Sequence, residues 1–415
     1  MEIKHYLCSM EQTHTTQAPM LGQETKEFIA AHRNDDVRTL ALQASRYPSV
    51  DIREAVTQIQ GWQLAKEKLP AWAATDGIIY PVRLSMEQCS SEATARYKAL
   101  LAQGTLMADL TGGFGIDCSY MARNFSRAIY IERNSALCDI ARHNFAQLGL
   151  GHIEIKNSVC EDILDTLPHC DWIYADPARR DNIGGKVVAL SDCEPDIPQL
   201  EARLMSRCNA AMIKCSPMLD ITAACRNLRH IKEVHIIAVN NECKELLLIL
   251  GHGTQSTPTA LHCINILKEG QQQFITTIEA QQRPVAYTDR VRKYLYEPNA
   301  AIQKGGCNAA LSHTMSIEKL HPNSQLFTSE SLLSDFPGRT FIVERVSPFS
   351  KKEIKSLLDG IKQANITVRN FPDTVQGLRK RLKIAEGGDT YIFATTLNNG
   401  DKVLVRCRKP HQLGT

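Results

Sequence analysis

The sequence predicts an α/β protein built around a mainly parallel β-sheet with helices on both faces. Between residues 105 and 270, short apolar segments typical of strands alternate with segments of helical periodicity. The clearest helical segment, 135–147, places Leu137, Ile140 and Ala141 on one face. A glycine-rich turn follows the first strand of the series. Because crossovers between parallel strands are right-handed, we expect the loops after the strands to lie along one edge of the sheet.

Seven strands are expected in this sheet. They cover residues 106–110, 128–131, 153–156, 172–175, 210–214, 234–239 and 261–267. The chain is expected to divide into four parts: a helical region at 1–80, the sheet domain at 81–270, a connecting segment at 271–330 and a small α+β domain at 331–415. A helix is expected at 289–296 within the connecting segment.

Composition narrows the class of protein. Of the 415 residues, 43% are hydrophobic and 22% are charged, which is ordinary for a globular protein. No apolar stretch follows a basic start, and none approaches the roughly 20 residues of a membrane span, so we expect a cytoplasmic protein without a membrane partner. The fourteen cysteines are expected to be reduced thiols. No Cys-x-x-Cys pair occurs and the histidines are scattered, so no metal site is expected.

Charge is distributed unevenly along the chain. The net charge is +3, but residues 338–415 contain 15 Lys and Arg against 7 Asp and Glu, which leaves −5 for the remainder. A basic carboxyl-terminal domain fits contact with a polyanion such as RNA. A solvated basic surface would give the same count, and charge alone favours neither interpretation.

The glycine-rich turn carries the main chemical signal. Asp109 ends the first strand, and the turn Thr111-Gly112-Gly113-Phe114-Gly115 follows. Glycines here let the backbone approach a ligand that a Cβ atom would exclude. A dinucleotide fingerprint fails because its third glycine would fall at Cys118, and a phosphate loop fails because no Gly-Lys-Ser/Thr follows.

An acidic residue followed by a short spacer and Gly-x-Gly resembles class I methyltransferases that use S-adenosylmethionine. The resemblance implies that the turn wraps the methionine part of the cofactor and that Asp109 lies near its amino group. Glu132 closes the second strand, 17 residues after Gly115. In this family an acid at that place binds both ribose hydroxyls, which suits the two oxygens of a carboxylate. A surface glutamate is the alternative for Glu132.

The adenine contact departs from the family pattern. Val159 falls where an acid often follows the third strand, with Cys160 beside it. Either Glu161 or Asp162 substitutes for that acid, or backbone groups at Val159 and Cys160 read the adenine.

The segment Asp176-Pro177-Ala178-Arg179-Arg180 follows the fourth strand. Methyltransferases of nucleic-acid amino groups have an acid or Asn, then Pro-Pro and an aromatic residue there, and the aromatic stacks on the flipped base. Asp176 and Pro177 therefore keep the catalytic place. Ala178 and Arg179 depart from the pattern, which puts amino-group chemistry in doubt. Arg179 and Arg180 are either ligands of a substrate phosphate or surface residues.

Two further segments border the expected pocket. Cys215 partly resembles the nucleophilic cysteine of RNA pyrimidine C5 methyltransferases, but Lys214, Ser216 and Pro217 equally suit a plain pocket wall. The polar loop 181–186 is either a cover for the substrate or an idle insert.

The whole pattern resembles a bacterial group of class I methyltransferases with a THUMP-like carboxyl-terminal domain. The stretches that carry it are 84–92, 109–115, 174–180, 294–299 and 387–394. The resemblance implies a Rossmann-like seven-stranded sheet at 81–270, a ferredoxin-like segment at 271–330 and a THUMP-like domain at 331–415. Within 84–92, Gln88 and Ser90 are candidates to reach the pocket, as is the nearby Thr94, but helix capping explains them as well.

THUMP domains bind structured RNA in RNA-modifying enzymes. We therefore expect S-adenosylmethionine as the cofactor. We expect the partner to be a tRNA or an rRNA rather than DNA, and we expect Arg379, Lys380 and Arg381 to contact its phosphates. A methyltransferase of a small molecule or protein is the alternative, as is a cofactor-binding or RNA-binding protein without catalysis. The methylated atom and the oligomeric state do not follow from the sequence.

Overall fold

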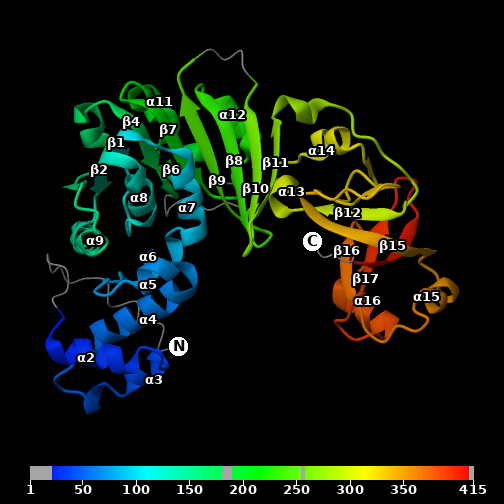
Figure 1. Ribbon diagram of the computed structural model, residues 1–415, viewed down its shortest axis with the longest axis horizontal. Coiled ribbons are helices and arrows are strands. Elements are labelled where there is room, and N and C mark those ends of the chain that lie inside the picture. Colours follow the sequence, from blue (N-terminus) through cyan, green and yellow to red (C-terminus); the bar gives the residue numbers. More distant parts are fainter. Residues whose placement is uncertain (1–20, 180–188, 254–257, 411–415) are drawn as a thin grey trace. The chain divides into compact units, whose positions relative to one another are not determined.

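The computed structural model describes residues 21–179, 189–253 and 258–410, which form two compact units (Figure 1). The first unit contains the described residues up to 230 together with 248–253, and the second contains the rest. None of the helices in these described ranges is long and apolar enough to cross a membrane.

Six α-helices lie in the described residues before the first strand of the first unit. They are α2 (Gln23–His32), α3 (Val37–Leu42), α4 (Ile52–Lys68), α5 (Pro70–Ala73), α6 (Arg83–Gln88) and α7 (Glu92–Leu101). Asp51 caps α4 by accepting the Glu54 N–H, and Ser91 caps α7 by accepting the Thr94 N–H. The buried ring of Trp72 meets Phe114 edge to face at 5.0 Å between centroids. This contact joins the helical region to the glycine turn.

Five parallel strands form the first unit's part of the large sheet, in the order β3-β2-β1-β4-β7. Their bounds are β1 (Gly104–Asp109), β2 (Phe125–Glu132), β3 (Ile153–Asn157), β4 (Cys170–Ala175) and β7 (Cys208–Cys215). The intervening helices are α8 (Ile116–Met121), α9 (Ser135–Gln147), α10 (Cys160–Ile163), α11 (Ile197–Met205) and α12 (Ile221–Asn227). Asp109 is in register with Tyr130 and Tyr174, so β1, β2 and β4 end at one edge.

In the part of the chain that the structure describes, the large sheet has nine strands rather than the expected seven. The seven expected segments all form strands, and the additional ones are β9 (Glu242–Gly251) and β11 (Gln271–Thr277). In the second unit, β10 (Ala260–Ile266) pairs parallel with β8 (Ile231–Val239) and antiparallel with β11.

A second sheet of seven strands occupies the carboxyl-terminal region, in the order β13-β14-β12-β15-β18-β17-β16. Its strands are β12 (Tyr294–Pro298), β13 (Glu318–Lys319), β14 (Phe327–Ser329), β15 (Gly338–Pro348), β16 (Asn365–Arg369), β17 (Thr390–Thr396) and β18 (Lys402–Arg408). The helices are α13 (Ala300–Lys304), α14 (Asn308–Met315), α15 (Lys351–Leu357) and α16 (Val375–Leu382).

The prediction of a helix at 289–296 is wrong. Residues 294–298 are strand β12, which pairs antiparallel with both β14 and β15. Leu295 and Tyr296 are both fully buried, as in a strand covered on both faces. Pairing on two sides and burial on two faces outweigh the local helical pattern.

Candidate active site

The glycine turn between β1 and α8 floors a cavity of about 270 Å³, near the lower end of the range for small-molecule sites. Gly113 and Gly115 have φ values of 54° and 87°, which favour glycine. A Cβ atom at Gly112 would lie 2.2 Å from Cε2 of the buried Tyr130 ring. Tyr130 also donates its hydroxyl proton to the Gly113 carbonyl at 2.5 Å. The turn therefore depends on glycine for its conformation and for its packing.

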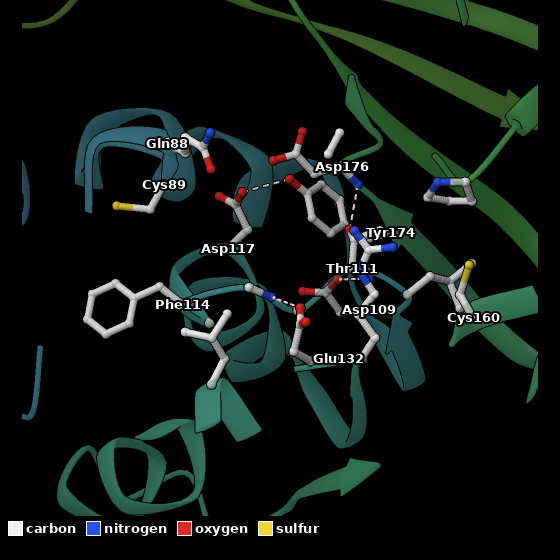
Figure 2. A pocket seen from close by; sticks show the side chains of 18 of the residues that line it. Gln88, Cys89, Asp109, Thr111, Phe114, Asp117, Glu132, Cys160, Tyr174 and Asp176 are labelled. Carbon is white, nitrogen blue, oxygen red and sulfur yellow. Dashed lines mark hydrogen bonds between the residues drawn. The ribbon is translucent and has the colours of Figure 1, made fainter. Parts of the chain in front are cut away.

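Phe114, predicted to belong to the cofactor site, has its side chain in the core and its backbone in the turn. It borders the cavity, but its ring is buried among the amino-terminal helices, against Trp72. Figure 2 shows this ring pointing away from the carboxylates of the site. The side chain of Phe114 therefore fixes the turn to the core, and its backbone is what the turn can present to a ligand.

Glu132, at the end of β2, is tied to the turn by its own carboxylate (Figure 2). One oxygen accepts the Gly113 N–H at 2.9 Å, and the other accepts the Asn134 N–H at 2.8 Å. Each carboxylate oxygen has a further lone pair for a ligand hydroxyl. The carboxylate is thus held in one orientation at the cavity wall, as binding of a vicinal diol requires.

Asp109 is a nearly fully buried acid at the cavity. Burial raises its pKa well above the ordinary value, and the nearby carboxylates Asp117, Asp176 and Glu132 add to the shift, against the Thr111 N–H that it accepts at 3.0 Å. Four acids around one cavity disfavour the ionised form of Asp109 unless a cation binds. The cavity is therefore suited to a positively charged ligand.

Asp176 follows β4 and lies at the same cavity. Its backbone N–H donates to the Thr111 hydroxyl at 2.7 Å, so a side chain of the glycine turn positions it. Lys214, on β7, donates to one carboxylate oxygen of Asp176 at 2.5 Å. Lys214 is largely buried, which makes this ion pair a fixed part of the site rather than a surface contact.

A buried polar network lies behind Asp176. Asp117, on α8, accepts hydrogen bonds from Ser90 at 2.7 Å and Tyr174 at 2.6 Å, and it pairs with the fully buried Lys98 at 3.1 Å. Burial alone would raise the pKa of Asp117, but Lys98 and Lys214 outweigh burial and lower it. Asp117 is therefore an anion at neutral pH, and it fixes Tyr174 at the cavity wall (Figure 2).

The predicted adenine residues also reach the cavity. Val159 precedes α10 and is partly exposed, and Cys160 begins that helix. Glu161, one of the two acids considered as a substitute, also borders the cavity, whereas Asp162 does not belong to its lining.

Two predicted pocket residues behave differently. Pro177 lies between Asp176 and Ala178 but is not part of the cavity lining. Cys215 is buried away from the cavity, and burial raises the pKa of its thiol. A nucleophilic cysteine needs a lowered pKa and access to substrate, so the geometry gives covalent catalysis no support.

The predicted substrate residues lie in separate places. Arg179 is exposed in the short strand β5 (Ala178–Arg179), which pairs with β6 (Cys193–Glu194). Arg180 and the loop 181–186 lie outside the described residues. Three further predicted residues are on α16 of the second unit: Arg379, Lys380 and Arg381.

Several lining residues escaped the sequence interpretation. Glu194 and Pro195 reach the cavity because β6 pairs with β5, and Arg133 bonds Glu194 at 2.8 Å. Gln88 and Ser90, left open between two roles, do line the cavity, whereas Thr94 belongs to the cap of α7. Cys89, Leu137, Asp117 and Tyr174 also belong to the lining. Of these segments, only 84–92 was marked in the sequence as part of the site, through its resemblance to the methyltransferase family.

Comparison with known proteins places this geometry in a family. An "uncharacterized S-adenosylmethionine-dependent methyltransferase" of Mycobacterium tuberculosis is 22% identical over 323 residues, 76% of this chain and 84% of that protein. The crystal structure of a "putative methyltransferase" from Porphyromonas gingivalis W83 is 36% identical, with a TM-score of 0.84 over 93% of this chain and 98% of that one. The chain belongs to the S-adenosylmethionine-dependent methyltransferases.

The second unit adds two matches to this methyltransferase. Residues 294–337 match a ferredoxin-like domain family, and residues 338–409 match the family described as THUMP domain-like. The expected class I methyltransferase with a THUMP-like domain is thus confirmed. S-adenosylmethionine is its cofactor, and the acid-rich cavity suits the cofactor's two positive charges.

Proposed function

We propose that this methyltransferase acts on structured RNA, a tRNA or an rRNA. The observation that carries the proposal is the match of residues 338–409 to the THUMP domain-like family, together with the cations that α16 displays there. THUMP domains bind structured RNA in RNA-modifying enzymes, and the resemblance of this domain to them implies the same kind of partner. The surplus of eight positive charges over residues 338–415 agrees with a polyanionic partner.

The helix α16 has the form expected of a phosphate-binding surface. Leu378 and Leu382 face the core, while Lys380 and Arg381 are exposed. Arg381 lies 3.8 Å from Asp373, a separation that leaves a weak, screened pair. Lys380 makes no ion pair with any described residue. Cations of this kind contact phosphates without reading the base sequence.

The first unit supplies the cofactor site in this proposal. Asp109 would receive the amino group of the methionine part, and Glu132 would receive the ribose hydroxyls. The backbone at Val159 and Cys160 would border the adenine. Gly113 would let the cofactor approach the turn closely, because it has no Cβ atom and the space beside it is open. The absence of a Cβ atom at Gly112 and Gly115 instead makes room for Tyr130 and Phe145.

Asp176 would orient the attacking atom of the substrate. The cofactor supplies an electrophilic methyl group on its sulfonium, and transfer is a direct displacement in which alignment is the main task. Lys214 holds one oxygen of Asp176, and Thr111 holds its backbone. The second carboxylate oxygen can then accept a hydrogen bond from the target group and fix its direction.

A small-molecule or protein substrate is the second candidate. It is favoured by Ala178 and Arg179, which stand where amino-group methyltransferases of nucleic acids have a proline and a base-stacking aromatic residue.

Mass spectrometry of RNA nucleosides separates the two candidates. RNA from a strain that lacks the gene is expected to lack one methylated nucleoside, which the wild-type gene restores and an Asp176→Ala gene does not. An unchanged set of RNA nucleosides, with methyl transfer from labelled cofactor into a protein or small-molecule fraction, would favour the second candidate.

A further inference from the structure

We propose that Glu233, His235 and His262 form a binding site for a divalent transition-metal ion such as Zn²⁺, independent of the methyl-transfer site. One potential ligand atom from each residue lies within 4.8 Å of the other two. All three residues belong to the second unit, on strands β8 and β10. The structure therefore offers two imidazoles and one carboxylate at one point of the sheet.

The strand geometry explains why these side chains converge. Glu233 and His235 are two residues apart on β8, so both project from the same face of the sheet. His262 on β10 is the direct cross-strand neighbour of His235 in the parallel pair β8–β10, and neighbouring strands lie about 4.7–4.9 Å apart. The site thus rests on paired strands rather than on a flexible loop.

Both imidazoles already meet the same carboxylate oxygen. Oε2 of Glu233 lies 2.9 Å from Nε2 of His235 and 3.6 Å from Nε2 of His262. The two rings stack at 4.3 Å between centroids with an interplanar angle of 5°. The two ring planes are therefore nearly parallel, and a rotation of the more exposed ring, His262, would aim one nitrogen of each ring at a single ion.

Burial suits a site that opens to solvent. The His235 side chain is 2% exposed, whereas those of His262 and Glu233 are 21% and 43% exposed. An ion held here would have three protein ligands and water in the remaining position. Nitrogen and carboxylate ligands favour Zn²⁺, Co²⁺ or Ni²⁺ over Ca²⁺ and Mg²⁺, which prefer oxygen ligands throughout. The ion would join β8 to β10.

Sequence patterns could not predict this site. Zinc motifs are recognised by ligands at short fixed spacings, and here 26 residues lie between His235 and His262 along the chain. The pairing register of β8 with β10 brings them together.

Titration of the full chain with Co²⁺, followed by visible absorption, tests the proposal. One equivalent of Co²⁺ is expected to bind, without a near-ultraviolet thiolate charge-transfer band, and Zn²⁺ is expected to displace it. Loss of a group that only supports a metal ligand weakens binding by up to about 100-fold. Glu233→Gln and His262→Asn each remove a direct ligand, so each should weaken Co²⁺ binding by more than about 100-fold. His313→Asn is the matched control, because His313 is exposed in the same unit and bonds only a backbone carbonyl.

Thermal unfolding of each variant without metal checks that the fold is kept. We expect it to be kept, because the side chains of Glu233 and His262 are partly exposed. The proposal is overturned by failure to bind Co²⁺, by a thiolate band, or by equal affinity in the parent and the two ligand variants.

Discussion

At the scale of single residues, the site depends on acidic side chains whose surroundings disfavour a negative charge. Asp109 is buried beside Asp117, Asp176 and Glu132, and its pKa is raised. Two of these four acids have a lysine as a direct partner: Asp117 pairs with the fully buried Lys98, and Asp176 pairs with the largely buried Lys214. A cationic cofactor would relieve this excess of negative charge, so the cofactor completes the electrostatics of the site.

Asp109→Asn is expected to weaken binding of S-adenosylhomocysteine, which has the same amino group as the cofactor, by about 10- to 100-fold, the range for one charge-assisted hydrogen bond. Burial and the neighbouring carboxylates raise the pKa of Asp109 in the free protein, and the ammonium group favours the ionised carboxylate, so binding is expected to release a proton in the pH range where Asp109 titrates. Wild-type affinity should therefore rise with pH up to the raised pKa, and the variant should lose this dependence. Calorimetry at several pH values measures both. Parallel pH profiles would contradict the assignment.

Thr111→Val should lower kcat about 10- to 100-fold while changing the dissociation constant for the cofactor by less than about threefold. The valine keeps the shape but removes the hydroxyl that accepts the Asp176 N–H, and small misplacements of a positioning group have effects of this size. Thr111→Ser keeps the hydroxyl and serves as the control. Equal losses in both variants would show that the hydroxyl does not position Asp176.

At the scale of elements, the glycine turn and its two flanking strands were predictable because the motif is continuous in sequence. Asp109, the turn and Glu132 all reach the cavity where expected. Glu194 and Pro195 were not predictable, because they arrive through the pairing of β5 with β6. The apolar run 246–250 fits a buried helix or a strand equally well by its pattern, and the structure makes it part of β9.

Gly112→Ala is expected to destabilise the protein by about 1–3 kcal/mol, the usual cost of overpacking. The added methyl group would collide with the fully buried ring of Tyr130, which the sheet holds in place. Gly151→Ala is the matched control, since a Cβ atom there meets nothing within 4 Å. Denaturant unfolding of both variants measures the difference. Equal stability would mean that the turn can shift to accept a side chain.

At the scale of the whole molecule, the chain combines a cofactor-binding unit with a basic second unit. The sequence predicted both parts from strand and helix alternation and from charge. It missed β11, a largely polar edge strand that pairs with the neighbouring β10. It misread 289–296 as a helix because the pairing of β12 depends on β14 and β15, which come later in the chain.

Lys380→Gln should weaken RNA binding and reduce the slope of log K against log salt concentration by about 1, the effect of losing one phosphate contact. Lys268→Gln removes an equal charge from the exposed turn between β10 and β11 and should leave the slope unchanged. Filter binding of bulk tRNA and rRNA at several salt concentrations measures both. The same slope for parent and Lys380→Gln would exclude this helix from the RNA interface.

The most direct test of methyl transfer to RNA is incorporation of tritiated methyl groups from S-adenosylmethionine into total RNA by the purified protein. RNA from a strain that lacks the gene should become labelled, whereas RNA from the parent strain, already methylated at the target, should not. Asp176→Asn should abolish labelling while still binding cofactor. No label in any RNA class, or equal labelling of both RNA preparations, would contradict the account.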